Sequence, residues 1–422
     1  MIAFRHALGG ALLAAATAAC AEAPSAVGPP LHQGVASMSS GSAATQAVGR
    51  MIFFDERLSA NQNQSCASCH DPASGWTGAR SDVNAAGAVY EGSIAGRFGN
   101  RKPPSSAYAT LSPIFHLAVE RKDALFVGGN FWDGRATGEH LGNPAADQAQ
   151  GPFLNPLEQA LPGPGDVVGR ICAGSYAAQF TAVWGAAMCD GAHTTEAYDA
   201  VGLSIAAFEG SSESNAFTSK FDYHQAGLAR LTPEEQLGLA LFRGKAKCAG
   251  CHVLNGGPNG EALFTDFTYD NIGVPKNPEN PFYTMPPEFN PAGAAWVDPG
   301  LGGFLATRTA FEALAGENLG KQKVPTLRNV DLSPSPQFVK AYGHNGYFKT
   351  LGGIVHFYNT RDVKPTCPGP YTESQALASG CWPAPEVAAN VNRDELGDLH
   401  LTAKQEQAIV ALLKTLSDGY RP

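Results

Sequence analysis

The feature that most constrains this chain is a five-residue pattern that occurs twice. Cys66-Ala67-Ser68-Cys69-His70 and Cys248-Ala249-Gly250-Cys251-His252 both read Cys-x-x-Cys-His. This is the attachment signature of c-type haem, in which two thiols bond to the porphyrin and the following imidazole ligates the iron. A redox-active thiol pair does not require a histidine after both motifs, and the motifs lie too far apart in the sequence for a compact zinc ribbon. The sequence therefore predicts two covalently bound haem c groups, with His70 and His252 as iron ligands.

The first residues have the pattern of a leader segment. Arg5 and His6 precede a small apolar run over residues 7–19, which is too short to cross a bilayer. We expect a signal peptide over residues 1–21, cut near Ala21. Alternatively, Thr17-Ala18-Ala19-Cys20 is a degenerate lipobox, and Cys20 carries a lipid anchor. Both interpretations export the protein, and we expect it in the periplasm.

The other four cysteines form two local pairs, Cys172 with Cys189 and Cys367 with Cys381. Nearby thiols usually oxidise in an exported protein. We therefore expect two disulfides, and the alternative is four free buried thiols.

Charge and composition exclude some classes of partner and of fold. Lys and Arg number 29 against 38 Asp and Glu, so the net charge is −9. This balance argues against nucleic acid or an anionic membrane surface as a partner, because both require a cationic face. The 48 glycines and 30 prolines predict long, turn-rich connections. Strand-like alternation is scarce, which favours a mainly α fold.

The sequence repeats itself once, loosely, around the two motifs. Apolar residues at helical spacing precede the first motif over 45–58, and a helix with Thr232 as its N-cap precedes the second. Each half closes with a further helix, over 196–209 and over 402–416, the latter with Thr402 as N-cap. We predict two cytochrome c-like domains, at 40–227 and 228–422, each carrying one covalent haem.

The stretch over 253–325 departs from helical patterning, with 9 Pro and 10 Gly in 73 residues. It is either a disordered insertion or an ordered loop packed over a haem. Eight aromatic residues favour the ordered loop: Phe264, Phe267, Tyr269, Phe282, Tyr283, Phe289, Trp296 and Phe304.

Motifs between and after the two haem signatures resemble the bacterial di-haem cytochrome c peroxidases and their relative MauG. They are Phe131-Trp132-Asp133-Gly134-Arg135, Gln148-Ala149-Gln150-Gly151-Pro152, Asn155-Pro156-Leu157-Glu158, Val324-Pro325-Thr326-Leu327-Arg328-Asn329 and Gly343-His344-Asn345-Gly346. The resemblance extends over nearly the whole chain beyond the leader. It implies a periplasmic di-haem peroxidase that reduces hydrogen peroxide at the N-terminal haem, with electrons relayed through the C-terminal haem from a small cytochrome or cupredoxin.

The resemblance also assigns roles to single residues. Glu158 would move the peroxide proton from one oxygen to the other as a general acid–base group. Gln148 would orient the peroxide, Pro152 would keep that side of the pocket narrow, and Trp132 would relay charge between the haems. Calcium between the domains is common in the family, but Pro336 to Tyr342 is rearranged here and Asn100 is displaced, so calcium is only a weak expectation.

Two departures from the peroxidase pattern bear on the mechanism. No histidine follows the first motif where these peroxidases carry a removable iron ligand, since His116 lies late in that segment. We therefore expect an open first haem. Tyr358 stands fourteen residues after His344, where the peroxidases have methionine and MauG has tyrosine. We expect Tyr358 to ligate the second iron, and the alternative is a helix core aromatic whose hydroxyl is bound elsewhere.

Two other functions remain open. One is a MauG-like oxidase that uses peroxide to oxidise a side chain of a partner protein. The other is a di-haem electron-transfer protein without peroxide chemistry.

Overall fold

A computed structural model describes residues 41–120 and 123–422. The predicted signal peptide over 1–21 and the alternative lipid anchor at Cys20 lie outside these residues. Within the described residues, we find no helix with the length and apolar character needed to cross a bilayer.

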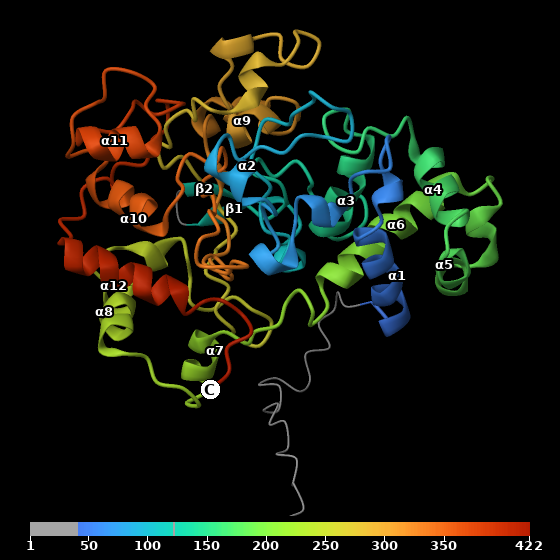
Figure 1. The fold of residues 1–422 in the computed structure, drawn as a ribbon, viewed down its shortest axis with the longest axis horizontal. Coiled ribbons are helices and arrows are strands. Elements are labelled where there is room, and N and C mark those ends of the chain that lie inside the picture. The colour runs from blue at the N-terminus through green and yellow to red at the C-terminus, as the bar shows by residue number, and fades with distance from the viewer. Residues whose placement is uncertain (1–40, 121–122) are drawn as a thin grey trace, which may run out of the picture. The chain divides into compact units, whose positions relative to one another are not determined.

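Helices dominate the described part of the chain, which confirms the mainly α prediction (Figure 1). The α-helices are α1 Ala43–Phe53, α2 Ser81–Ala85, α3 Pro144–Leu154, α4 Pro164–Cys172, α5 Ala177–Trp184, α6 Thr194–Glu209, α7 Lys220–Gln225, α8 Pro233–Arg243, α9 Gly300–Leu305, α10 Leu351–Thr360, α11 Glu373–Ser379 and α12 Ala403–Lys414. The strands form two antiparallel pairs, β1 His116–Glu120 with β2 Asp123–Val127, and β3 Tyr269–Asp270 with β4 Gln322–Lys323. Short 3-10 turns and loops connect them.

The helix before the first motif is shorter than its apolar spacing predicts. Helix α1 starts at its N-cap Ser42 and ends at Phe53, not at Leu58. The Asp55 carboxylate accepts a hydrogen bond from the Arg57 backbone N–H at 3.0 Å. This bond starts a separate 3-10 turn at Glu56–Leu58, because an aspartate bound to nearby backbone competes with helix continuation.

The other three predicted helices form at or near the expected positions. Thr232 caps α8 with a capping box to Glu235, and Thr402 caps α12 with one to Gln405. Each box satisfies two backbone N–H groups that have no partner inside the helix. Helix α6 begins at Thr194, two residues before the expected start, and ends at Glu209 as predicted.

The opening and closing helices of the two halves pack in the same way. A methyl group added at Gly49 of α1 would come within 1.8 Å of the Ser204 carbonyl oxygen on α6. One added at Gly238 of α8 would come within 2.0 Å of the Ala408 carbonyl oxygen on α12. Glycine thus permits close backbone approach in both pairs, and Ser204 of α6 corresponds to Ala408 of α12. Figure 1 shows α8 beside α12 in one half and α1 beside α6 in the other.

Each half has its own hydrophobic core. One cluster is drawn from residues 48–217 with Leu263, and a second from residues 221–416. By its contacts, the described chain nevertheless forms one compact unit. The division into domains at 40–227 and 228–422 therefore stays a prediction, supported by the separate cores.

The Pro/Gly-rich stretch over 253–325 is ordered and contains β3, α9 and β4. Its aromatic residues pack elsewhere than expected. Tyr269 and Phe304 join Phe115 of the first half, and Phe282 packs edge-on against Trp296. None of the eight aromatic residues lines the haem cavities described below. The loop itself borders the second of these cavities, at positions that include Asp270, Ile272 and Val324. Its place beside that cavity therefore agrees with the prediction, while the rings pack into neighbouring parts of the core.

Both predicted disulfides form. Cys172 is bonded to Cys189, and Cys367 to Cys381. Cys66, Cys69, Cys248 and Cys251 are the free cysteines of the described chain.

A buried ion pair joins segments that are far apart in the sequence. The Arg328 guanidinium is fully buried and lies 2.5 Å from the Asp222 carboxylate of α7. It also donates to the Ala262 carbonyl oxygen at 2.7 Å and lies over the Tyr108 ring.

We expect Asp222→Asn to destabilise the protein by about 3–5 kcal/mol, because it leaves the Arg328 charge buried without its partner. Chemical denaturation of the purified holoprotein measures the change. Asp82→Asn is the matched control, since Asp82 pairs with Arg80 on the exposed surface, and it should leave the midpoint unchanged. Equal effects of the two variants would contradict the assignment.

Candidate haem cavities and the tryptophan between them

The first Cys-x-x-Cys-His motif borders a cavity of about 160 Å³. The structure brings to it every residue predicted for the first haem site: Cys66, Cys69, His70, Trp132, Gln148, Pro152 and Glu158. They come from three separate parts of the chain, namely the motif, the loop before α3, and α3 with the turn after it. The predicted site is thus assembled by the fold.

Local sequence explains how α3 presents its side chains. Asn143 caps the helix, and Gln148 and Pro152 lie four residues apart on one face. The helix ends before Asn155, whose side-chain amide donates to the Glu158 carboxylate at 2.8 Å. Asn155 therefore both follows the helix end and orients the candidate proton-transfer group.

The second motif borders a larger cavity, of about 240 Å³. Cys248, Cys251, His252 and Tyr358 all line it. So do the segment over 324–330 and His344, which the sequence placed beside the second haem.

The donor atoms in both cavities fit a c-type haem. The Nδ1 atom of His70 lies 3.3 Å from the Trp76 carbonyl oxygen, and that of His252 lies 2.8 Å from the Phe264 carbonyl oxygen. Such contacts fix the ring tautomer. Burial lowers the pKa of His70 to about 4 and also lowers that of His252. Both imidazoles are therefore neutral, which is the form that ligates iron.

Tyr358 has the surroundings of a candidate ligand. It lies on α10, and its hydroxyl makes no hydrogen bond to any described residue, so the alternative of a hydroxyl bound elsewhere finds no support. Burial is the main cause that raises the pKa of Tyr358, and interactions with Asp270, Cys248 and Cys251 add to it. Tyr358 thus lines the same cavity as the attachment cysteines.

Trp132 lines both cavities and is nearly buried, at 8% exposure. Its indole Nε1 donates to the Lys102 carbonyl oxygen at 2.8 Å, and its own carbonyl accepts from the Lys323 N–H at 2.8 Å. Lys102 belongs to the first half and Lys323 to the second. The ring is therefore fixed by both halves of the chain.

The loop around Trp132 has a counterpart in the second half. Isolated bridges close the loop of Trp132 at Asn130 and Ala136, and the loop of His344 at Tyr342 and Phe348. The Trp132 and His344 rings meet edge-on, with centroids 6.5 Å apart. The Lys102 N–H donates to the His344 carbonyl, as the Lys323 N–H donates to that of Trp132. Trp132 thus lies where equivalent loops of the two halves exchange hydrogen bonds.

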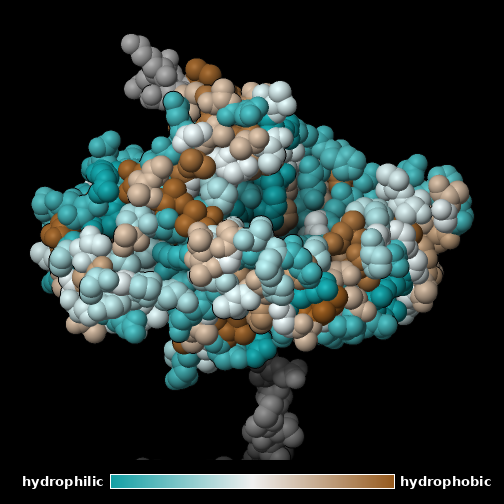
Figure 2. Space-filling model, turned by 90° about the horizontal axis from the view of Figure 1, so that it is seen from above, coloured by the Kyte–Doolittle hydropathy of each residue, from teal (hydrophilic) through white to brown (hydrophobic). Residues whose placement is uncertain are grey.

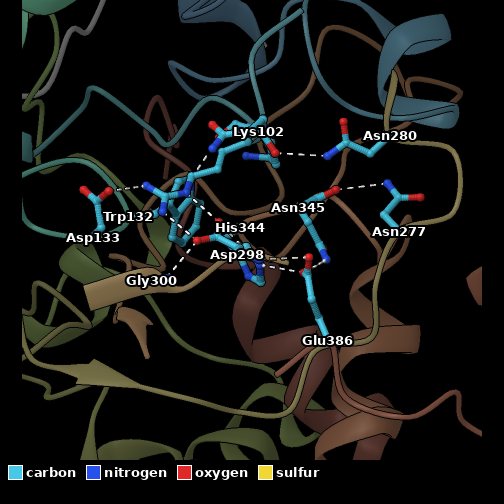
Figure 3. A network of polar contacts seen from close by, with 12 residues as sticks. Lys102, Trp132, Asp133, Asn277, Asn280, Asp298, Gly300, His344, Asn345 and Glu386 are labelled. Atoms are coloured by element: carbon cyan, nitrogen blue, oxygen red, sulfur yellow. Dashed lines mark hydrogen bonds and ion pairs between the residues drawn. The ribbon is translucent and has the colours of Figure 1, made fainter. Parts of the chain in front are cut away.

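A network of charged groups surrounds this contact (Figure 3). Arg101 is 2.6 Å from both Asp133 and Asp298, and the pKa of Asp298 is lowered by this guanidinium. The His344 Nε2 atom lies 3.4 Å from Glu386. The carboxylates beside Trp132 are therefore paired with cationic or imidazole groups from this chain.

Glu158 has the electrostatics of a proton-transfer group. Burial raises the pKa of Glu158, while Arg135 and the hydrogen bond from Asn155 oppose the rise. A general acid–base group works best when its pKa approaches the operating pH. The cavity shifts the Glu158 pKa in that direction.

Of the described histidines, only His70 lines the first cavity. His116 lies on β1, is exposed and contacts the Ile114 carbonyl oxygen. It does not reach the cavity, in agreement with its exclusion as a ligand.

The sequence interpretation missed several residues of the site. Lys102 lines both cavities, and Lys323 lines the second. Burial lowers the pKa of each to about 7. Each stands two residues before a proline, Pro104 or Pro325, a spacing that an internal alignment would have revealed. Glu209 of α6 also lines the first cavity.

The calcium expectation stays untested. The carbonyl oxygen of Asn100 accepts a hydrogen bond from Asn280 at 3.0 Å. The neighbouring Arg101 already neutralises the nearby carboxylates Asp133 and Asp298.

Comparison with known proteins agrees with the geometry. The family model for di-haem cytochrome c peroxidase matches residues 43–230. The methylamine utilization protein MauG of Paracoccus denitrificans is 35% identical over 90% of this chain and 90% of its own. The cytochrome-c peroxidase IdrP2 of a Pseudomonas species is 29% identical, over 80% of each chain. The crystal structure of the diheme peroxidase BthA from Burkholderia thailandensis covers 91% of this chain and 88% of that one, with a TM-score of 0.72 and 29% identity.

The match to MauG extends over most of both chains. The family binds two c-type haems, and its members are oxidoreductases that act on peroxide. The chain therefore belongs to the di-haem cytochrome c peroxidase and MauG family.

Proposed function

We propose that hydrogen peroxide is reduced in the first cavity, and that electrons reach it from the second cavity through Trp132. The observation that carries this proposal is the joint placement of Glu158, Gln148 and Pro152 in a cavity whose only described histidine is His70. The second cavity holds a second candidate ligand, Tyr358.

Four cysteines and two histidines would hold the cofactors: Cys66, Cys69 and His70 in the first cavity, and Cys248, Cys251 and His252 in the second. When bound, a c-type haem would supply a redox-active iron that can take a further ligand. The protein would supply the imidazoles of His70 and His252, whose ring orientation is set by the carbonyl contacts at Nδ1.

The side chains of the first cavity position peroxide and move its proton. The Glu158 carboxylate accepts the proton of one peroxide oxygen and returns it to the other, which leaves as water. The Asn155 amide holds this carboxylate in place. The Gln148 amide orients the peroxide by hydrogen bonding, and the Pro152 ring limits the space beside it.

Trp132 is proposed to carry electrons between the cavities. It borders both of them, and two hydrogen bonds fix it to opposite halves. The ionic network of Figure 3 keeps the charges beside it paired.

A second candidate function rests on Tyr358. A phenolate ligand favours oxidised iron, whereas a thioether favours reduced iron. If Tyr358 ligates the second iron, the protein is suited to a MauG-like reaction, in which peroxide drives oxidation of a side chain on a partner protein.

We propose a periplasmic location, supported by the two disulfides and by the leader-like sequence. Lipidation of Cys20 is the alternative that keeps the protein at the membrane. The partner is a small donor cytochrome or cupredoxin, or else a protein substrate. The face in Figure 2 has hydrophobic patches beside a hydrophilic hollow, and this pattern does not single out one docking site.

The mature protein should carry two covalent haems, each adding about 0.6 kDa, because both motifs present free thiols. Intact mass after denaturation measures this. Cys248→Ala with Cys251→Ala should remove one adduct and leave the other. A single adduct in the unaltered protein would contradict the assignment of two haem sites.

The function is tested by peroxide consumption with a reduced small cytochrome as donor, together with the spectrum of the oxidised protein. We expect donor-dependent turnover and a high-spin ferric signal from an open first haem. A spectrum with both irons fully ligated and no turnover would identify an electron-transfer protein instead.

A further inference from the structure

Glu209 is a buried carboxyl for which the proposed reaction has no use. It is the last residue of α6, is only 3% exposed and lines the first cavity together with Ile205, one helical turn before it. Its carboxylate makes no hydrogen bond or ion pair with any described residue. A buried carboxyl without a partner is costly, so its presence calls for a physical reason.

The second cavity has leucine at the equivalent position. Because Ser204 and Ala408 make the same glycine contact, the next residues, Ile205 and Ile409, correspond to one another. Both line their cavities, and so do the residues four positions later, Glu209 and Leu413. Leucine is the ordinary choice for such an apolar wall. The carboxyl is therefore a specific feature of the first cavity.

No charged group of the surrounding elements is paired with Glu209. The cavity also contains Arg101 and Arg135, which are engaged by aspartates, and Lys102 and Glu158, which have their own partners. The other titratable groups that line it are His70, Cys66, Cys69 and Tyr90.

The helices packed on α6 carry four charged groups, and three of them have partners elsewhere. Arg50 of α1 pairs with Glu213, Asp147 of α3 accepts from residues 140 and 141, and Arg170 of α4 donates to the carbonyls of Arg57 and Ser59. The fourth, Asp166, lies in the first turn of α4. The state of Glu209 is thus set by burial, which raises its pKa to about 8.

We propose that Glu209 takes up a proton from solvent when an electron arrives in the first cavity, and releases it when that electron leaves. The inference rests on the proposed function in one respect, the placement of a redox centre in this cavity. An added electron makes the cavity more negative, and a nearby carboxylate then binds a proton more tightly. One O–H bond forms for each electron gained, and the net charge of the cavity is unchanged.

The chemistry explains why only the first cavity has this carboxyl. Reduction of one hydrogen peroxide to two waters consumes two electrons and two protons. Glu158 returns the proton that it takes, so it supplies no net proton. A second carboxyl that binds one proton with each electron provides the protons that the reaction consumes. The second cavity only passes electrons, and Leu413 suits that role.

The test is the pH dependence of the reduction potential of the first haem, measured without peroxide. The two haems are followed separately by electron paramagnetic resonance during a redox titration. Because burial raises the pKa of Glu209 to about 8, the carboxyl can take up a proton on reduction only near and above that pH. In that range the potential of the unaltered protein should rise as pH falls, by at most about 59 mV per tenfold change in proton concentration, the limit for one proton per electron. Glu209→Gln should remove this dependence. Glu213→Gln, the same change on the exposed surface, should preserve it.

Two further measurements keep the proposal falsifiable. Glu209→Leu copies the second cavity and should also give a pH-independent potential, which covers the case in which the glutamine variant folds poorly. Reduction should produce the infrared band of a protonated carboxylic acid, and this band should be absent from both variants. An unchanged pH dependence in both variants, or no such band, would overturn the proposal. The measurement of the reduction potential involves no peroxide. Its outcome therefore tests Glu209 even if the protein fails to reduce peroxide.

Discussion

Replacing Glu158 by glutamine is expected to slow peroxide consumption by about 10²–10⁴-fold, the usual contribution of a general acid–base group. Glutamine keeps the size of the side chain and the contact with Asn155, but it cannot accept the peroxide proton. Both haems should remain attached, since neither thiol motif is altered. Stopped-flow mixing with peroxide measures the rate.

The control for this variant is Glu139→Gln. Glu139 is exposed and pairs with Arg308 at 3.0 Å, so the same chemical change there should leave the rate unaltered. A pH profile adds a second criterion, because the limb that reports the carboxyl should disappear only in the Glu158 variant. Equal rates for the Glu158 variant and the unaltered protein would remove Glu158 from the mechanism.

The haem motifs, the two capping boxes and the disulfide pairs could be predicted because each depends on residues close together in the sequence. Thr232 and Glu235 act within one helical turn, and Cys367 is near Cys381 along the chain. The same local logic failed at the end of α1. There the Asp55 side chain, which does not change the apolar spacing, starts a new turn.

The relation between the halves could not be predicted in the same way. It depends on backbone contacts, such as that of the Lys102 N–H with the His344 carbonyl, which carry no side-chain signature. The loops of Trp132 and His344 share the turn glycines Gly134 and Gly346, both at positive φ, and little else. The aromatic residues over 253–325 were correctly read as a sign of order, but their burial partners are spread over one another, the first half and the core of the second half.

The role of Glu209 was accessible in principle. The closing helices of both halves were recognised from their apolar spacing, and aligning them places Glu209 against Leu413. That comparison becomes decisive only when the glycine contacts fix the register between α6 and α12. The signal is a carboxyl in one copy of the repeat at a position where the other copy has an apolar residue. Amino-acid composition alone does not reveal it.

The choice between the two enzymatic functions depends on Tyr358. Replacing it by phenylalanine removes the hydroxyl and should open the second iron, which would change the spectrum and raise the reduction potential of that haem. Replacing it by methionine should raise the potential further toward that of a Met-ligated haem, because a thioether favours reduced iron. The methionine variant should accept electrons from a small cytochrome more readily.

Tyr342 provides the control for these variants, since it is a second tyrosine that lines the same cavity. Burial is the main cause that raises the pKa of Tyr342, and the charges of Asp331 and Glu373 add to the rise. For Tyr358 it is Asp270 and the attachment cysteines that add to the rise. The pKa values of the two tyrosines thus respond to different neighbouring groups. Tyr342→Phe should leave the spectrum and potential of the second haem unaltered. If Tyr358→Phe also leaves both unaltered, Tyr358 is not a ligand, and reduction of peroxide with electrons from a small cytochrome becomes the better supported function.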